Sequence, residues 1–336
     1  MDRPSGVTDL SVSVVSYRTP ALLERCLSAL ATERQSLDMD VTVVDNASND
    51  GSAELVERQF PWVRLIRNDR NVGFGAAHNR VLRTANARYW LVLNSDAAPS
   101  KGALAKLIEF LDTNPQVAVA GPKLRYPDGS VQSSRRRFPT VATLFLESTQ
   151  LQRIWPDNTL LHRYYVQDRS DAELQDVDWL VGACLCVRAA AAHQVGLLDE
   201  RFFMYSDELD WCRRFRAAGW RVSYMPYAEV VHLEGASSRL DLAARDRLFQ
   251  ASKLEYAAKW HGPLVAQALR AYLVLEYLVR GLEEALKLTL RSRVPERRAR
   301  LRVISSGLRS ALPPAWRSQA DRACRFAARP PDPKRD

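Results

Sequence analysis

Short apolar runs alternate with amphipathic stretches over the first 121 residues of this 336-residue chain. The runs have the length of buried strands, and the stretches between them repeat apolar residues at helical spacing. The predicted strands are residues 10–17, 41–45, 63–68, 89–94 and 117–121, and the predicted helices lie within residues 20–33, 52–60, 73–85 and 101–112. This alternation predicts an α/β fold in which a parallel sheet is covered by helices on both faces.

Short polar clusters follow four of the predicted strands. They are Ser16-Tyr17, Asp45-Asn46, residues 71–75 and residues 94–96. Ligands of open α/β sheets bind beyond the carboxyl ends of the strands. We therefore expect these clusters to meet at one crevice, and a nucleotide-sized site is the leading hypothesis.

The cluster Asn94-Ser95-Asp96 stands directly after an apolar run, where a carboxylate needs a compensating partner. The chain has no GxxxxGK[ST] loop, and its first strand leads into SYRTP instead of GxGxxG. A bound diphosphate would therefore need another counter-charge. Asn94 and Asp96 offer the oxygen ligands that Mg2+ or Mn2+ prefers. The alternative is that Asp96 caps a helix that begins near Ser100.

Two further apolar segments are predicted to be strands. Residues 176–188 indicate one buried strand, and residues 221–235 indicate a strand pair that ends at His232. A histidine at a strand end is more often a hydrogen-bonded structural residue than a metal ligand.

Between these segments, acids stand among aromatic residues. Ser206 is expected to cap a helix whose first turn holds Asp207 and Glu208, with Asp210 just beyond. Acids at that place interact favourably with the helix dipole, which is a purely structural explanation. A carboxylate at a helix start beside a wet apolar pocket also meets the requirements of a general base.

The ordered set of motifs resembles the inverting, metal-dependent glycosyltransferases of family 2, which have the GT-A fold. The similarity is greatest to the rhamnosyltransferase-like branch, which acts on bacterial cell-wall and surface-polysaccharide intermediates. The matching words span about residues 10 to 238 and read VSVVSYRTPALLERCLSAL, VVDNASNDGS, NVGFGAAHN, LVLNSDA, WLVGACLCVRAAA, GLLDERFFMYSDELDWCRRFRAAGW and VVHLEGAS.

The resemblance implies a role for each matching residue. Asp96 and His232 would hold Mg2+ or Mn2+, and Asn94 replaces the first aspartate of the family's metal motif. Glu208 would be the catalytic base, with Asp207 as a second candidate because the family's Glu-Asp order is reversed here. The nucleotide-sugar donor would be bound by Ser16, Tyr17, Asp45, Asn71, Gly73, Asn79, Asn94 and Ser95.

On this resemblance the chain is expected to be an inverting hexosyltransferase. The favoured donor is dTDP-rhamnose, with a UDP-sugar as the alternative, and the acceptor is a saccharide or a polyprenyl-linked saccharide of bacterial polysaccharide biosynthesis. Two other classes remain open. A metal-dependent nucleotidyltransferase would usually need a glycine-rich basic loop after the first strand, which SYRTP does not supply. An inactive nucleotide-sugar-binding protein is kept open by Asn94 and by the reversed Asp207-Glu208 pair.

Charge and the C-terminal segment add a second feature. Residues 1–240 are expected to form the glycosyltransferase domain, and residues 241–336 a basic helical extension. Its long helix, residues 264–290, contains too many charges to span a membrane. Six arginines within residues 291–302 favour either a solvated appendage or a peripheral anchor on an anionic membrane surface.

Nucleic acid is not an expected partner, although the net charge is +9, because no recognised nucleic-acid-binding module accompanies that charge. The five cysteines are scattered without a CxxC pair, and the N-terminus lacks an apolar signal region. These features predict a cytoplasmic protein, peripheral at the inner face of the plasma membrane if the basic segment binds lipid.

Overall fold

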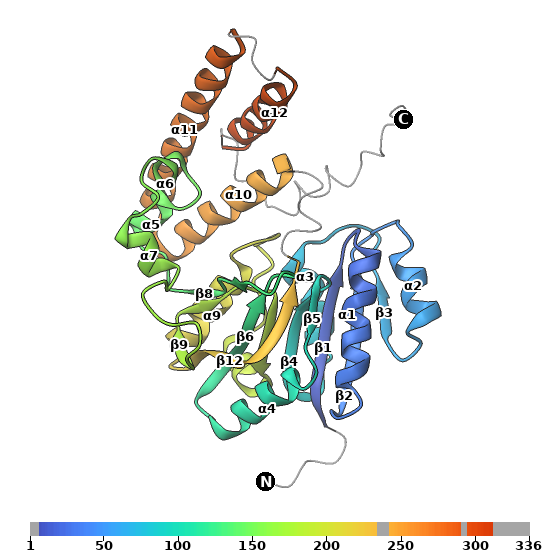
Figure 1. Cartoon of the computed structure of the whole chain (residues 1–336). Helices are drawn as coiled ribbons and strands as arrows, with labels where there is room; N and C mark the ends of the chain where they lie inside the picture. The colour runs from blue at the N-terminus through green and yellow to red at the C-terminus, as the bar shows by residue number, and fades with distance from the viewer. Residues whose placement is uncertain (1–6, 234–241, 290–293, 312–336) are drawn as a thin grey trace.

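A large mixed sheet runs through the molecule (Figure 1). The structure is a computed structural model that describes residues 7–233, 242–289 and 294–311. Within these residues the sheet has ten strands, which are β1 Thr8–Ser16, β2 Met39–Asp45, β3 Arg64–Arg67, β4 Ala87–Asn94, β5 Ala97–Pro99, β6 Val117–Arg125, β7 Val131–Gln132, β9 Gln175–Val177, β11 Cys184–Arg188 and β12 Arg221–His232. Its main path runs β3-β2-β1-β4-β11-β6-β12-β5, with β7 on β6 and β9 on β12. A separate pair joins β8 Arg135–Arg136 to β10 Trp179–Leu180.

The N-terminal part of the sheet is parallel, as predicted. β1 pairs in parallel with β2 and β4, and β2 pairs in parallel with β3. The five predicted strands run in the same direction, but β11 lies between β4 and β6 and is antiparallel to both, so the sheet as a whole is mixed. A strand that is buried on both faces is a continuous apolar run in either direction, so its composition does not reveal its orientation.

Two predictions in the second half need correction. Residues 176–188 do not form one strand, because the chain turns twice there and gives β9, β10 and β11. Residues 221–235 do not form a strand pair. Instead β12 is a single strand that pairs with β6, β9 and β5, with a register irregularity between Met225 and Glu229.

Helices cover both faces of the sheet. One face is covered by α1 Pro20–Glu33, α2 Ser52–Gln59 and α4 Ala103–Thr113, whose apolar side chains share a buried cluster with β1 and β4. The other face is covered by α3 Phe74–Leu82, α8 Ala189–Val195 and α9 Asp207–Ala217. In α1 the buried residues Leu23, Leu27 and Leu30 follow the predicted helical spacing.

The first turn of α4 is capped by a distant residue and not by Asp96. The buried Glu33, at the end of α1, accepts hydrogen bonds from the backbone amides of Gly102 and Leu104, the latter at 2.9 Å. A carboxylate at a helix N-terminus satisfies amides that have no partner within the helix. The alternative in which Asp96 caps this helix is therefore wrong, and its carboxylate is left for another role.

In the C-terminal part, residues 242–289 and 294–311 are described, and they form α10 Leu242–His261, α11 Pro263–Thr289 and α12 Val294–Ala311. Apolar residues of all three belong to the same buried cluster as the second face of the sheet. Figure 1 shows α10 and α11 beside the short helices α5 Val141–Leu146, α6 Gln150–Ile154 and α7 Thr159–Tyr164, with α12 on the other side of α11. The boundary at residue 240 stays a prediction. Among the described residues, no helix combines the length and the apolar character that crossing a bilayer requires.

Candidate active site

The carboxyl ends of the parallel strands bring the predicted donor residues to one edge of the sheet. In the register, Ser16 stands opposite Asp45 on β2, and its neighbour Val15 stands opposite Asn94 on β4. Ser16 Oγ and Asp45 Oδ1 are buried and have no hydrogen-bond partner among the described residues. Buried polar atoms normally have partners, so these two indicate a ligand at this edge. Tyr17, half-buried at the next position, stacks under the Arg18 guanidinium.

Asn46 organises the loop that follows β3. Its Nδ2 donates to Asn71 Oδ1 (2.8 Å) and to the carbonyl of Gly73 (3.1 Å). Its Oδ1 accepts from Asn68 Nδ2 (2.8 Å) and from the amide of Val72 (3.0 Å). One buried amide therefore holds the loop against the end of β2, which positions Asn71 near Asp45.

Gly73 is required by its surroundings. Its φ is +94°, and a Cβ atom there would lie 2.4 Å from the carbonyl oxygen of Phe203. This close approach joins the loop to the segment that precedes α9. Asn79 has a different setting, since its Nδ2 donates to Leu198 O (2.8 Å) and Glu200 Oε1 (2.9 Å). Its contact with the nucleotide stays a prediction.

The predicted metal ligands come together although 136 positions separate them in the chain. β5 and β12 are antiparallel, with His232 opposite Ala97, and the amide of Leu233 donates to the carbonyl of Asp96 (3.0 Å). This pairing places His232 Nε2 3.2 Å from Asp96 Oδ1 and 3.3 Å from Asn94 Nδ2. Ser95 turns away, and its Oγ lies 3.0 Å from Thr19 Oγ1.

Gln132 on β7 orients the ring of His232. Gln132 Oε1 lies 2.8 Å from His232 Nδ1, and both side chains are buried. An amide oxygen only accepts hydrogen bonds, so Nδ1 is the donor to Gln132 and the ring is held with Nε2 directed to Asp96 and Asn94. A hydrogen bond to the other ring nitrogen orients ligating histidines in this way.

The donor set fits a divalent cation that is shared with a ligand. Asp96 offers a carboxylate oxygen and His232 an imidazole nitrogen, while Asn94 turns its amide nitrogen to His232 and keeps its amide oxygen for a cation or a ligand. No group of three or more histidine, cysteine, aspartate or glutamate residues suited to a metal is found in the part of the chain that the structure describes. The remaining ligands would be phosphate oxygens and water, as is usual for Mg2+ at nucleotides.

The acids Asp207 and Glu208 begin α9 and point to different elements. Glu208 packs on Gly182, where a Cβ would lie 3.4 Å from three of its carbons, and Glu208 Oε1 accepts from the Gly182 amide (3.3 Å). The next carbonyl, that of Ala183, accepts from the amide of Asn94 (3.0 Å). The half-buried Glu208 therefore contacts Gly182, and the next residue, Ala183, contacts Asn94 at the end of β4.

Asp207 faces the interior. It is 1% exposed, and its Oδ2 would lie 3.5 Å from a Cβ placed on Gly75 in α3. Burial, the charge of Glu208 and a hydrogen bond to Glu208 raise the pKa of Asp207 well above its usual range. Among the described residues, no hydrogen-bond donor reaches Asp207 Oδ2 or Glu208 Oε2. A proton on the Asp207 carboxyl would supply the missing donor between the two acids. A protonated acid cannot accept a proton, so Glu208 is the better base.

The other residues at the start of α9 have structural roles. Asp210 is fully buried between Arg214 Nε (2.9 Å), Lys259 Nζ (2.6 Å) and Trp260 Nε1 (2.8 Å). Ser206 occupies the N-cap position, but its side chain makes no capping hydrogen bond because its φ of +62° is left-handed. Tyr205 is also left-handed, with φ +69°. Strained backbone of this kind often accompanies functional sites.

We expect Asp207→Asn to stabilise the protein, and more so at pH 8 than at pH 5. The raised pKa means that the folded state keeps a proton which the unfolded chain, with a pKa near 3.9, has lost. Stability is therefore lost as the pH rises from the unfolded pKa through the folded pKa, and asparagine removes that loss. Thermal unfolding should show a gain on the order of a few degrees at pH 8.

Asp112 supplies the control with the opposite sign. Burial is outweighed there by hydrogen bonds from Arg88 and Tyr89, and the pKa of Asp112 is lowered. Asp112→Asn should therefore lower the melting temperature, with a larger loss at pH 8 than at acidic pH. Equal losses for Asp207→Asn at both pH values would contradict a protonated Asp207.

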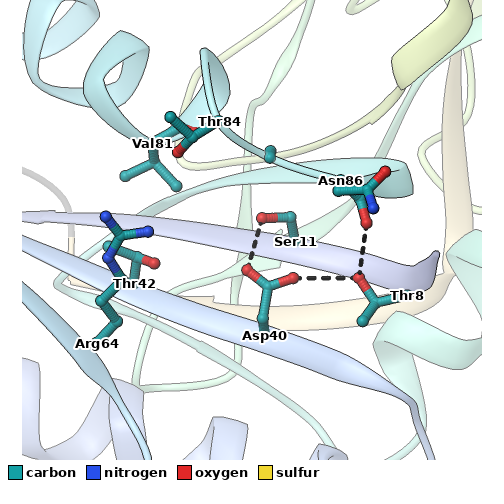
Figure 2. Close-up of a pocket in the computed structure, with 9 residues that line it drawn as sticks. Thr8, Ser11, Asp40, Thr42, Arg64, Val81, Thr84 and Asn86 are labelled. Atoms are coloured by element: carbon teal, nitrogen blue, oxygen red, sulfur yellow. Dashed lines mark hydrogen bonds between the residues drawn. The ribbon is translucent and has the colours of Figure 1, made fainter. Parts of the chain in front are cut away.

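A cavity of about 250 Å³ lies elsewhere, among Thr8, Ser11, Asp40, Thr42, Arg64, Val81, Thr84, Ala85 and Asn86 (Figure 2). Thr8 begins β1 and Ser16 ends it, so the cavity is at the opposite end of the strands from the site. Asp40 is already bonded there by Ser11 Oγ (2.8 Å) and Thr8 Oγ1 (3.1 Å). We assign it no part in the chemistry.

The sequence patterns did not identify Gln132 and Gly182, and gave Asn46 no individual role. Asn46 was visible only as part of a strand-end cluster. Gln132 lies on a strand of two residues, and Gly182 lies in a turn inside an apolar run. No spacing rule selects either residue, because each acts through a partner that is distant in the chain.

Comparisons with known proteins agree with this geometry. Residues 11–169 match the family described as Glycosyl transferase family 2. The chain is 33% identical over 296 residues to an N-acetylglucosaminyl-diphospho-decaprenol L-rhamnosyltransferase of Mycobacterium tuberculosis, across 81% of this chain and 94% of that protein.

Two solved structures have a similar fold. One is a mannosyltransferase from Pyrobaculum calidifontis in complex with GDP-Man and Mn2+, with a TM-score of 0.52, 15% identity and coverage of 92% of this chain and 90% of that one. The other is GalNAc-T7 with UDP, GalNAc and Mn2+, with a TM-score of 0.53, 16% identity and coverage of 75% and 51%. They confirm the expected GT-A type of α/β fold.

Proposed function

The chain belongs to glycosyltransferase family 2, and from this membership we propose that it transfers L-rhamnose from dTDP-rhamnose to a hydroxyl of a lipid-linked saccharide. The observation that supports the proposal is the similarity to the mycobacterial protein, which is named as a rhamnosyltransferase. The match covers 94% of that protein. Its name also specifies an N-acetylglucosaminyl-diphospho-decaprenol, so we propose a polyprenyl diphosphate saccharide as the acceptor here. The reaction would belong to bacterial cell-wall polysaccharide synthesis at the inner face of the plasma membrane.

We propose that Asp96 and His232 hold Mg2+ or Mn2+ at the donor diphosphate. When bound, such a cation neutralises the charge that develops on the leaving diphosphate. Gln132 holds the His232 ring with Nε2 turned toward Asp96 for this purpose. The orphaned polar atoms of Ser16 and Asp45 are then satisfied by the nucleoside of the donor.

We propose Glu208 as the general base. Glu208 is half-buried whereas Asp207 is almost fully buried, so the carboxylate of Glu208 is the one that an acceptor hydroxyl can reach and give its proton to. The deprotonated oxygen attacks the anomeric carbon as the bond to the diphosphate breaks on the opposite face. A single displacement of this kind inverts the anomeric centre and needs no covalent intermediate.

A UDP-sugar is the second donor class, because a similar structure holds UDP. Incubating the protein with dTDP-rhamnose, UDP-N-acetylglucosamine, UDP-glucose and GDP-mannose, with and without a polyprenyl diphosphate N-acetylglucosamine acceptor, separates the candidates. We expect acceptor-dependent release of dTDP in the presence of Mn2+ and none in EDTA. Acceptor-dependent release of UDP alone would select the second class. Diphosphate release from a nucleoside triphosphate would indicate a nucleotidyltransferase, and no turnover with any donor would indicate an inactive binding protein.

A further inference from the structure

Helix α11 presents an uncharged face to solvent along its length. Its exposed positions are Pro263, Leu264, Gln267, Ala268, Ala271, Leu275, Leu278, Val279, Leu282, Ala285 and Leu286. Leu264 is 84% exposed and Leu282 is 63% exposed. A surface helix of a water-soluble protein normally turns its apolar stripe to the core and its charges outward. The outward face of α11 has the opposite character.

The charged residues of α11 fix this orientation. Arg270, Glu276 and Glu284 are buried on the inner side, less than a tenth exposed. Arg270 Nη1 donates to the carbonyl of Ala311 (3.2 Å), and Glu284 Oε2 pairs with Arg297 (3.4 Å). Charges on the inner side therefore join α11 to α12, and the leucines are held outward.

Helix α6 extends the apolar surface. The amide of Gln150 donates to Glu276 Oε1 (3.2 Å), which ties α6 to α11, and Figure 1 shows the two helices side by side. Just beyond this contact, Ile154 is 77% exposed and Trp155 is 60% exposed. The α11 apolar face is defined here as Leu264, Leu275, Leu278, Val279, Leu282 and Leu286 with Leu151, Ile154 and Trp155. From its first to its last residue on α11 it is about 33 Å long.

Positive charge gathers at the same end of the molecule. Glu276, Glu283 and Glu284 are paired with four cations, which are Arg280, Lys287, Arg297 and Arg300. On α6 the exposed Arg153 is offset by the exposed Asp157 just beyond Trp155. In the sequence, four further arginines (Arg291, Arg293, Arg298 and Arg302) and one acid, Glu296, stand within residues 291–302, which adds three positive charges.

We propose that the α11 apolar face docks into the interfacial layer of an anionic membrane, with α11 lying in the membrane plane. Apolar burial together with attraction between arginines and acidic headgroups is the basis of such binding. A second copy of this chain would bring the same surplus of positive charge to the contact, so charge complementarity favours the lipid surface. Trp155 is suited to the headgroup level, where indole rings are enriched.

This inference rests on the proposed function only for its purpose, which is to bring the site to lipid-linked acceptors. Vesicle binding is measured without any sugar transfer. Failure of the docking surface and failure of the donor or acceptor assignment are therefore distinguishable.

The test is co-sedimentation of the full chain with vesicles of phosphatidylcholine alone or mixed with phosphatidylglycerol. Leu278→Glu with Leu282→Glu should weaken binding to the anionic vesicles by at least about tenfold. The matched control, Leu174→Glu with Tyr227→Glu, adds the same charge at exposed apolar residues elsewhere and should bind as the wild type does. Truncation of the arginine segment is a poorer test, because Tyr277 of α11 packs against Gly307 of α12.

Fluorescence quenching by brominated lipid gives a second readout on the wild-type fold. Vesicle-dependent quenching should fall in Trp155→Phe. The proposal would be overturned if the Leu278/Leu282 variant bound vesicles as well as the wild type, or if the wild type did not bind them. It would also be overturned if the wild type formed a dimer that the two substitutions disrupt and bound no vesicles. The last result would assign the face to a second copy of the chain.

Discussion

Replacing Glu208 with glutamine is expected to lower the turnover number by a factor of about 10²–10⁴, because general-base catalysis contributes that much. Glutamine keeps the size of the side chain and its packing on Gly182 but cannot take a proton. Donor affinity should remain nearly unchanged, since Glu208 lies on the acceptor side in the proposed mechanism. Steady-state transfer rates and equilibrium binding of the donor separate the two quantities.

The neighbouring acid provides the matched control. The raised pKa of Asp207 favours its protonated form in the folded protein, and Asp207→Asn is close to isosteric and isoelectronic with that form. We expect it to retain most of the activity. A dead Asp207→Asn beside an active Glu208→Gln would show that the base is Asp207, and activity in both variants would show that the base lies elsewhere.

Asp96→Ala should abolish detectable transfer and the part of nucleotide binding that depends on Mn2+ or Mg2+. A cation at the leaving diphosphate contributes several kcal/mol, so the rate should fall by at least about 10². His232→Ala should lose rate and metal dependence together, because His232 Nε2 lies 3.2 Å from Asp96 Oδ1. Calorimetric titration of dTDP with and without Mn2+ measures the binding part.

The control for Asp96 is Asp112→Ala. Asp112 bonds with the Arg88 guanidinium, and Arg88 lies near the opposite end of β4 from Asp96. Its loss should cost stability without changing the metal dependence of nucleotide binding. Full activity of the wild type in EDTA, or of Asp96→Ala with metal, would remove the cation from the mechanism.

The sequence pattern was sufficient for the parallel strands and for the edge where Ser16, Asp45 and Asn94 meet. Apolar strand runs, helical spacing and strand-end chemistry are local properties, so a single sequence records them. It was not sufficient for the antiparallel β11. The pairing of β5 with β12, which brings Asp96 to His232, is likewise a contact across the whole domain that no local pattern records.

The same limit applies to single side chains. The reversed order of Asp207 and Glu208 left two candidate bases. Burial and the neighbouring Glu208 distinguish them, because together they raise the pKa of Asp207 well above its usual range. The helix at residues 264–290 was predicted from its spacing, and α11 confirms it. Which face of that helix meets solvent depends on the ion pairs with α12, which the spacing does not contain.

The most direct test of the proposed mechanism is the anomeric configuration of the transferred sugar, determined by proton NMR on the product made from dTDP-rhamnose. A single displacement with Glu208 as the base predicts the configuration opposite to that of the donor. Retention of the donor configuration would contradict it, because retention requires a second displacement or a different kind of transition state.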